Sequence, residues 1–76
     1  MQTEFTCGIY TASYNLIGSP KWFVKANLHV IAIVDKNGVL IQFTANCPLF
    51  SQHDLIEISV LMNNIKRQYK QLQTNS

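Results

Sequence analysis

Charged residues are scarce in this sequence. They make up 13% of its 76 residues, against about 25% in an average soluble domain, while hydrophobic residues make up 47%. The apolar content and the aromatic residues exclude a disordered chain. The formal net charge is only +2, and a protein with so few charges tends to associate unless its apolar side chains are covered. We therefore expect a folded protein that forms a homodimer.

The patterns of secreted, membrane and disulfide-bonded proteins are also missing. The longest unbroken apolar run, Val30 to Val34, is too short to cross a membrane, and the first residues are not the basic start of a signal peptide. We expect a cytoplasmic protein without a membrane partner. The two cysteines, Cys7 and Cys47, lack a C-x-x-C spacing and are interpreted as small buried hydrophobic residues. The length predicts a single domain over residues 1–76.

No catalytic, metal-binding or cofactor-binding motif is present. Cys47 could act as a nucleophile with His53 or His29, but the predicted strands place Cys47 in the core and His29 on the opposite sheet face. Side chains of His53, Asp54 and Glu57 could bind a metal ion, yet acidic residues at a helix start more often complement the helix dipole. We expect a protein that is not an enzyme and holds no metal or cofactor.

Alternating apolar residues predict three strands. Every even position from 22 to 34 is apolar, which indicates a strand over residues 22–36 with its even face on a core. The odd positions are apolar in residues 39–47, which predicts a second strand of this kind. Residues 4–16 favour a strand as well, but their alternation changes phase midway. A bulge near Gly8, or burial of both faces, would explain this change.

Turn residues fix the order of the predicted strands. Asn37-Gly38 favours a two-residue type I′ turn, because both positions of that turn need a positive φ. In this register all apolar positions of the two strands face one side, and Ala32 lies opposite Phe43. A three-residue loop would shift the pairing by one residue and break the alternation. A second turn signal at residues 18–20 predicts that the strands follow one another as a meander.

The last third of the chain predicts one amphipathic helix over residues 52–73. Ser51 and Asp54 form an S-x-x-D capping pattern at its start. Apolar residues then recur in steps of three and four on one face, at Leu55, Ile58, Leu61, Met62, Ile65, Tyr69 and Leu72. The predicted fold is therefore α+β, a three-stranded antiparallel sheet with one C-terminal helix packed on it.

Some apolar residues lie outside this predicted core. Ile56 and Val60 lie on the helix face opposite the apolar stripe, where the chain's own N-terminal segment or a second subunit would cover them. Further apolar and aromatic residues are predicted on the outer sheet face: Tyr10, Tyr14, Phe23, Ile31 and Ile33. That face could bind a protein, be covered by the chain itself, or stack single-stranded bases. We predict a protein interface at these seven residues.

The basic residues suggest an alternative. Lys66, Arg67 and Lys70 form the one basic cluster, and Lys25 is a further cation on the predicted sheet. These residues could contact nucleic-acid phosphates. Cations near a helix end also offset the helix dipole and keep a protein of low charge dispersed.

In architecture, the predicted element order resembles AP2-type and integrase arm-type DNA-binding domains and compact phage-encoded inhibitors. AP2-type sheets present Arg and Trp to DNA, whereas the predicted strands contain no arginine. We predict a small protein-binding module, a regulator or inhibitor that occupies a partner's surface, and its size favours a phage or mobile-element origin. A small nucleic-acid-binding regulator is the alternative.

Overall fold

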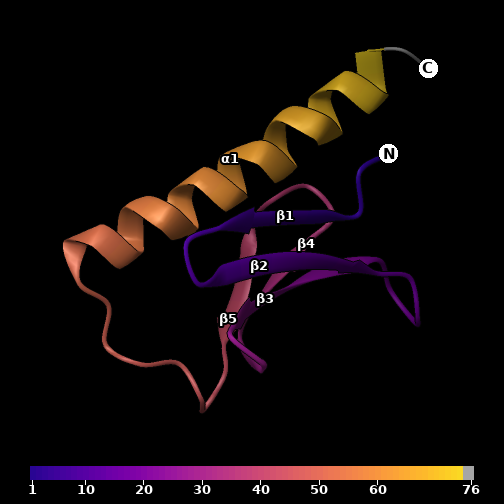
Figure 1. Cartoon of the computed structure of the whole chain (residues 1–76). Helices are drawn as coiled ribbons and strands as arrows, with labels where there is room; N and C mark the ends of the chain where they lie inside the picture. Colours follow the sequence, from indigo (N-terminus) through magenta and orange to yellow (C-terminus); the bar gives the residue numbers. More distant parts are fainter. Residues whose placement is uncertain (75–76) are drawn as a thin grey trace.

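Five short strands precede one long helix in the computed structural model, which describes residues 1–74 (Figure 1). The elements are β1 (Glu4–Cys7), β2 (Tyr10–Asn15), β3 (Lys21–Ala26), β4 (His29–Asp35), β5 (Leu40–Phe43) and α1 (Gln52–Thr74). Each strand pairs antiparallel with the next, so the spatial order of the sheet equals the chain order. The predicted α+β class with an antiparallel sheet and a C-terminal helix is confirmed, but the sheet has five strands and not three.

Two of the predicted long strands are in fact hairpins. Residues 4–16 fold back at Gly8, so that Cys7 pairs with Tyr10, and residues 22–36 fold back between Ala26 and His29. Gly8 has a φ of 61°, a positive value at the first loop position that two-residue type II′ turns require and that glycine adopts without strain. The phase change predicted to be a bulge or two-sided burial is therefore a turn.

The second hairpin could not be predicted from the alternation of apolar residues, because two irregularities cancel in that pattern. A two-residue loop moves the core-facing positions from even to odd numbers, and Ile31 is an extra, bulged residue of β4 that moves them back to even numbers at Ala32. The even positions in between do not face the core. Leu28 lies at the loop and is 91% exposed, whereas Ile31 is only 1% exposed. The bulged segment is held by Thr44, which donates to Val30 O and Ile31 O.

The turn between β4 and β5 has three residues, so the predicted type I′ turn is wrong. Gly38 N–H donates to Asp35 O at 3.1 Å, and Asp35 N–H donates to Val39 O at 2.9 Å. Gly38 has a φ of 92°, whereas Asn37 has no positive φ. This is a type I turn followed by a left-handed glycine. The Asp35 carboxylate supports it by accepting bonds from the backbone N–H groups of Asn37 and Val39.

The predicted pairing of Ala32 with Phe43 is nevertheless confirmed. The three-residue loop shifts the register by one, so that Val34 pairs with Leu40, and a bulge at Ile41 shifts it back. The strand ends at Phe43 and not at the predicted Cys47, and residues 44–51 form the connection to α1.

The helix begins where the capping pattern predicts. Ser51 Oγ accepts a bond from Asp54 N–H at 3.2 Å, and Asp54 Oδ2 accepts bonds from the Ser51 N–H at 3.0 Å and hydroxyl at 2.9 Å. These bonds to the charged carboxylate lower the pKa of Asp54. They form a reciprocal capping box that satisfies free backbone groups at the first turn.

The core lies between α1 and one face of the sheet. Its buried residues are Tyr10, Ala12, Trp22, Val24, Ile31, Ala32, Val34, Ile58, Leu61 and Ile65. Burial raises the pKa of the Tyr10 phenol, and the nearby Asp54 carboxylate adds to this shift. The rings of Phe5 and Tyr14 pack against Trp22 with centroid distances of 5.5 and 5.0 Å. The prediction that Tyr10 and Ile31 lie on the outer sheet face is therefore wrong.

The helix lies closest to the half of the sheet that β1 and β2 form. Among the strands of the described chain, α1 comes within 8 Å of β1 and β2, measured between Cα atoms, and of no other. Because the strands are in chain order, β5 lies at the edge farthest from these two (Figure 1). The core side chains of β3 and β4 are buried, and α1 also approaches the β4–β5 turn, where a Cβ added at Gly38 would lie 3.3 Å from the Lys66 backbone N. All four residues of β5 are nevertheless exposed. No helix within residues 1–74 has the length and apolar character needed to cross a membrane.

Candidate protein-binding surface

At one edge of the sheet, α1 lies close to β1 and bonds the backbone just before it. Gln2 N–H donates to Gln68 Oε1 at 2.8 Å, and Gln68 Nε2 donates to Gln2 O at 2.9 Å. One side-chain amide thus takes the place that a neighbouring strand's peptide group would have. At the other end of β1, the Glu57 carboxylate lies directly over Gly8, where it would meet any added Cβ. β1 also carries a charge of its own at Glu4.

The edge at β5 is open. All four residues of this strand are exposed, and it pairs with β4 alone within residues 1–74. Edge strands are usually protected by charged residues, proline, a bulge or a covering segment. Of these, β5 has only the bulge at Ile41. No residue from Val39 to Phe50 is charged.

Apolar side chains follow this open edge. We define the β5 patch as the exposed residues Val39, Leu40, Ile41, Phe43 and Leu49. Phe50 follows Leu49 in the connection to α1, and its ring lies 5.9 Å from that of Phe43 and 6.4 Å from that of Tyr10. The β5 patch thus combines an uncharged strand edge with exposed apolar side chains in the strand and its flanking segments.

Two members of the β5 patch belong to an unfinished core. Leu40 and Phe43 pair with Val34 and Ala32, both buried, and directly paired residues project from the same sheet face. Leu40 is nevertheless 37% exposed and Phe43 is 52% exposed. The helix-side core thus continues to the β5 edge, where the Phe50 ring packs on Phe43 and leaves it half exposed.

The seven residues predicted as a protein interface do not form one surface. Besides Tyr10 and Ile31 in the core, Tyr14 packs on Trp22 on the same side. Phe23 and Ile33 pair with each other on the outer sheet face, where both are half-buried. Of the seven residues, only Ile56 and Val60 on α1 are well exposed.

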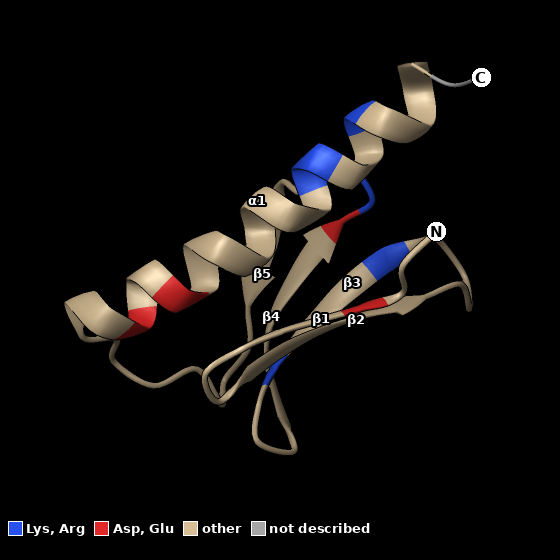
Figure 2. Ribbon diagram, turned by 45° about the horizontal axis from the view of Figure 1, so that its top comes forward, with Lys and Arg blue, Asp and Glu red and all other residues tan. Residues whose placement is uncertain are grey.

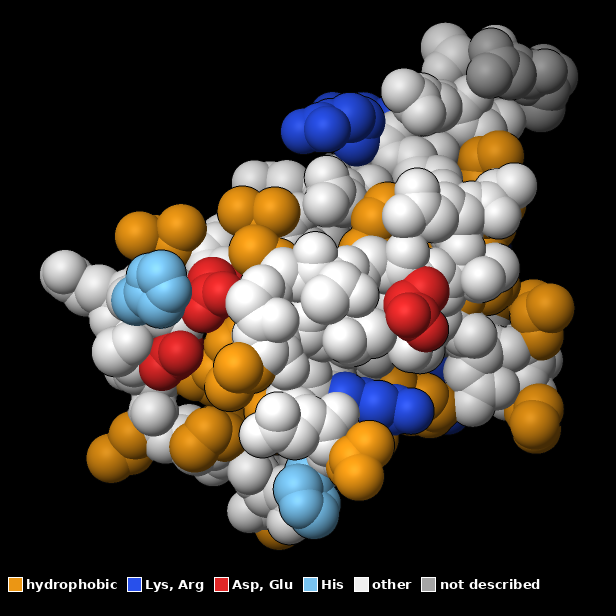
Figure 3. All heavy atoms as spheres, viewed as in Figure 1, with side chains coloured by type: hydrophobic (Ala, Val, Ile, Leu, Met, Phe, Trp, Pro, Cys, Tyr) orange, Lys and Arg blue, Asp and Glu red, His pale blue; other side chains and the backbone are white. Residues whose placement is uncertain are grey.

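That pair, Ile56 and Val60, is 63% and 42% exposed on α1. In the space-filling view, hydrophobic side chains lie on the N-terminal half of α1 and on the connection from β5. Basic side chains lie on the C-terminal half of α1 (Figure 3).

The basic residues form one group on the helix. Lys66, Arg67 and Lys70 are exposed and, with Asn63, line a shallow hollow on α1. Lys25 does not join them, because it pairs with Thr11 and Val30 in the sheet. The ribbon shows the acidic residues of α1 near its start and the basic ones in its second half (Figure 2).

The Cys47 thiol and the His53 imidazole have different partners. The Cys47 thiol donates to Pro48 O at 3.5 Å, whereas His53 Nε2 lies 3.4 Å from the carboxylate of Glu57. His53 is therefore paired with an acid and not with the thiol. Within the part of the chain that the structure describes, no three His, Cys, Asp or Glu side chains are grouped as a metal site.

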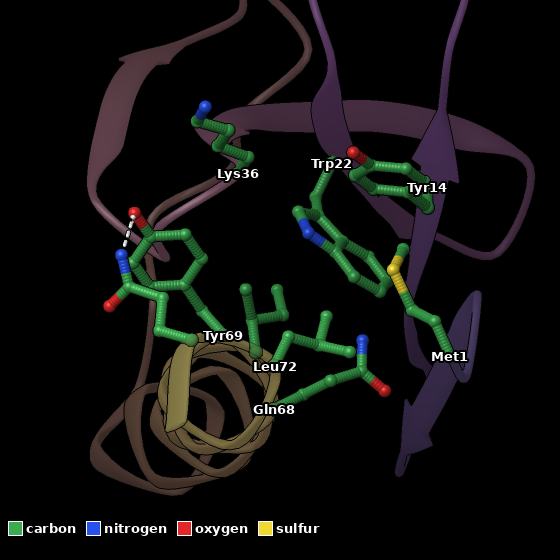
Figure 4. Close-up of a pocket in the computed structure, with 9 residues that line it drawn as sticks. Met1, Tyr14, Trp22, Lys36, Gln68, Tyr69 and Leu72 are labelled. Carbon is green, nitrogen blue, oxygen red and sulfur yellow. Dashed lines mark hydrogen bonds between the residues drawn. The ribbon is translucent and has the colours of Figure 1, made fainter. Parts of the chain in front are cut away.

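An apolar cavity of about 270 Å³ lies under the second half of α1. Trp22 and Tyr14 form one wall, with Tyr69 and Leu72 opposite and the Lys36 side chain at the mouth (Figure 4). Gln73 Nε2 donates to the Tyr69 hydroxyl at 2.8 Å and holds that ring at the rim.

The described residues thus present a basic helix face, an apolar cavity and the β5 patch. Of these three, the β5 patch alone combines exposed apolar side chains with a strand edge whose one protecting feature is a bulge. Comparison of the chain with protein-family models, curated proteins and solved structures found no match.

The β5 patch was not predicted from the sequence, because the predicted helix packs on the apolar face of residues 39–47. One signal was available: the absence of charge from Val39 to Phe50 is unusual for a strand that must face water.

Proposed function

We propose that the protein is a small non-enzymatic binding module that acts in the cytoplasm as a regulator or inhibitor, by occupying the surface of protein partners, a second copy among them. The observation that carries this proposal is the open edge of β5, which carries no charge, has apolar residues at all positions but Gln42, and is exposed along its length. An exposed sheet edge accepts a further strand, whose backbone supplies the affinity and whose side chains supply the specificity.

The composition of the β5 patch supports this proposal. The centre of a protein interface is depleted in charged residues and enriched in aromatic ones. The β5 patch has no charge and contains Phe43, with the Phe50 ring beside it. A partner would desolvate no charged group of this chain between residues 39 and 50.

Site-specific photo-crosslinking in cells tests the proposal. A photoreactive residue replaces Ile41 in the β5 patch or, as a matched control, Leu28, which is exposed at a loop outside the patch. We expect discrete protein adducts from position 41 and none from position 28. Excess unlabelled wild-type protein should suppress the adducts, and excess Phe43→Lys protein should not. Equal labelling at both positions, or none at either, would contradict the proposal.

Nucleic-acid binding is the second candidate function, and one observation favours it. Lys66, Arg67 and Lys70 share one exposed surface of α1, and none of them forms an ion pair within the described residues. Three phosphate contacts would give weak binding with a slope of about −2.7 in log affinity against log salt. A gel-shift titration that shows no retardation at about 10 μM protein in low salt removes this candidate.

A further inference from the structure

We propose that a second copy of the chain occupies the β5 patch, with the β5 strands of two copies side by side and antiparallel around a twofold axis. The two sheets then form one continuous sheet. This inference rests on the proposed function, because it takes the β5 patch as the binding surface and names its occupant.

Symmetry favours this occupant. In an antiparallel pair related by a twofold axis, each strand offers the same row of N–H and C=O groups to the other, so a free edge complements itself. The edge of β5 is free within residues 1–74, with the bulge at Ile41 between its paired residues, whereas the backbone at Gln2, just before β1, is bonded to the Gln68 amide. Of the two edges, β5 is therefore the one available for such pairing.

Charge permits close approach of two identical surfaces. An identical partner brings the same charges to an interface, and like charges that face each other destabilise it. From Val39 to Phe50 there is no charge to repeat.

Charge also fits the ends of the assembly. The twofold axis places the two helices antiparallel on one face of the joined sheet. Within one chain the acidic residues of α1, Asp54 and Glu57, lie near its start and the basic residues Lys66 and Arg67 in its second half (Figure 2). In the proposed dimer, the acidic start of one helix therefore lies at the same end as the basic half of the other.

The unfinished core gives the second copy a stabilising role. Leu40 and Phe43 lie on the core face and stay partly exposed, and a second copy joined at β5 brings its own Leu40 and Phe43 to the same place. Obligate homodimer interfaces resemble a domain core cut in half in this way. A standard interface takes about 800 Å² from each partner, roughly one sixth of the 5077 Å² accessible surface of this chain.

Analytical ultracentrifugation of the full chain tests the proposal. We expect a species of twice the 8.7 kDa chain mass at high micromolar concentration. Phe43→Lys should weaken self-association by at least about 30-fold, the effect of losing an interface residue worth 2 kcal/mol. Leu28→Lys, which adds the same charge at an exposed apolar residue outside the β5 patch, should leave the association unchanged.

A measurement on the wild-type sequence guards against a variant that fails to fold. In a mixture of isotope-labelled and unlabelled chains, we expect intermolecular NMR contacts from residues 40–43. A wild-type chain that stays monomeric at all concentrations overturns the proposal. A dimer whose contacts come from Ile56 and Val60 instead also overturns it.

The result also separates this proposal from the proposed function. A monomeric chain that still forms adducts from position 41 with other proteins contradicts only the second copy as occupant. A monomeric chain that forms no adducts contradicts both.

Discussion

The two edge strands of the sheet differ in how their backbone is protected. β1 carries a charge at Glu4, runs alongside α1, and has its start closed by the Gln68 amide. β5 carries no charge, has apolar residues at all positions but Gln42, and is exposed along its length. Since both strands face the same aggregation hazard, the difference shows which edge the described chain protects, and our proposal assigns the other edge to a partner.

The path of the chain explains this difference. A meander puts β1 and β5 at opposite edges, and the connection over residues 44–51 leads away from β5 to the start of α1 (Figure 1). The strands that α1 approaches most closely are β1 and β2, and at the other edge it reaches the β4–β5 turn at Gly38 while β5 stays exposed.

The largest stability effect is expected at the contact between α1 and the β1–β2 turn. Gly8→Ala introduces a Cβ at a positive φ and against the Glu57 carboxylate, so we expect a loss of about 2 kcal/mol in urea unfolding. Gly18→Ala is the matched control, because its φ is also positive but nothing lies within 4 Å of the new Cβ. Equal losses in the two variants would show that the Glu57 contact contributes nothing.

The next largest loss of stability is expected at the N-cap of α1. Ser51→Ala removes the hydroxyl that accepts the Asp54 N–H bond, and we expect a loss of about 1 kcal/mol, the usual effect of removing an N-cap side chain. Ser59→Ala, at an exposed position within α1, is the control and should change the free energy of unfolding by less than about 0.5 kcal/mol. An unchanged stability in Ser51→Ala would contradict the capping assignment.

Removing the Gln68 amide would leave the backbone just before β1 without its bonds to α1. Gln68→Ala removes both bonds to Gln2, and we expect a loss of about 0.5 to 1 kcal/mol together with faster amide exchange at the start of β1. Gln71→Ala, on the same helix, is the control and should leave amide exchange at Gln2 unchanged. If Gln2 exchanges at the same rate in both variants, the Gln68 amide does not protect the edge.

Acid should weaken the same helix start. The fold lowers the pKa of Asp54, so its carboxylate stabilises the protein above about pH 4, the ordinary value, and this contribution is lost as the pH falls through the lowered pKa. We expect Asp54→Asn to have a lower Tm than the wild type at neutral pH. The difference should disappear at a pH below the lowered pKa. A constant Tm difference across this range would contradict the assignment.

The smallest effect is expected on the outer face of the helix. Val60→Lys should change the stability by less than about 0.5 kcal/mol and leave self-association intact, because Val60 is partly exposed and belongs to α1, not to the β5 edge. Sedimentation of this variant beside Phe43→Lys checks the expectation. Loss of the dimer in Val60→Lys would move the interface from the β5 edge to the helix.

Local features of the fold could be predicted from the sequence. The capping pair Ser51 and Asp54 predicts the helix start, and it depends on residues that are close in sequence. Such a feature is determined mainly by short-range chemistry. The pairing of Ala32 with Phe43 is also as predicted, but only because the three-residue turn and the bulge at Ile41 cancel.

Features that depend on cancellation or on distant packing could not be predicted. The turn after Ala26 and the bulge at Ile31 each reverse the alternation, so together they leave the even-numbered pattern unbroken. The placement of α1 over β1 and β2 depends on the path of residues 44–51, and the apolar alternation continues to Cys47 although the strand ends at Phe43. The β5 patch was missed for this second reason, since residues 39–47 show the same alternation whether or not a helix covers them.

Amide hydrogen exchange of the two edge strands at low and high protein concentration tests the central claim most directly. We expect the amides of residues 40–43 to become more protected as concentration rises, while those of residues 4–7 keep the same protection at every concentration. Protection in β5 that does not change with concentration, or that rises equally in β1, would contradict the assignment of the β5 edge as the surface where a second copy binds.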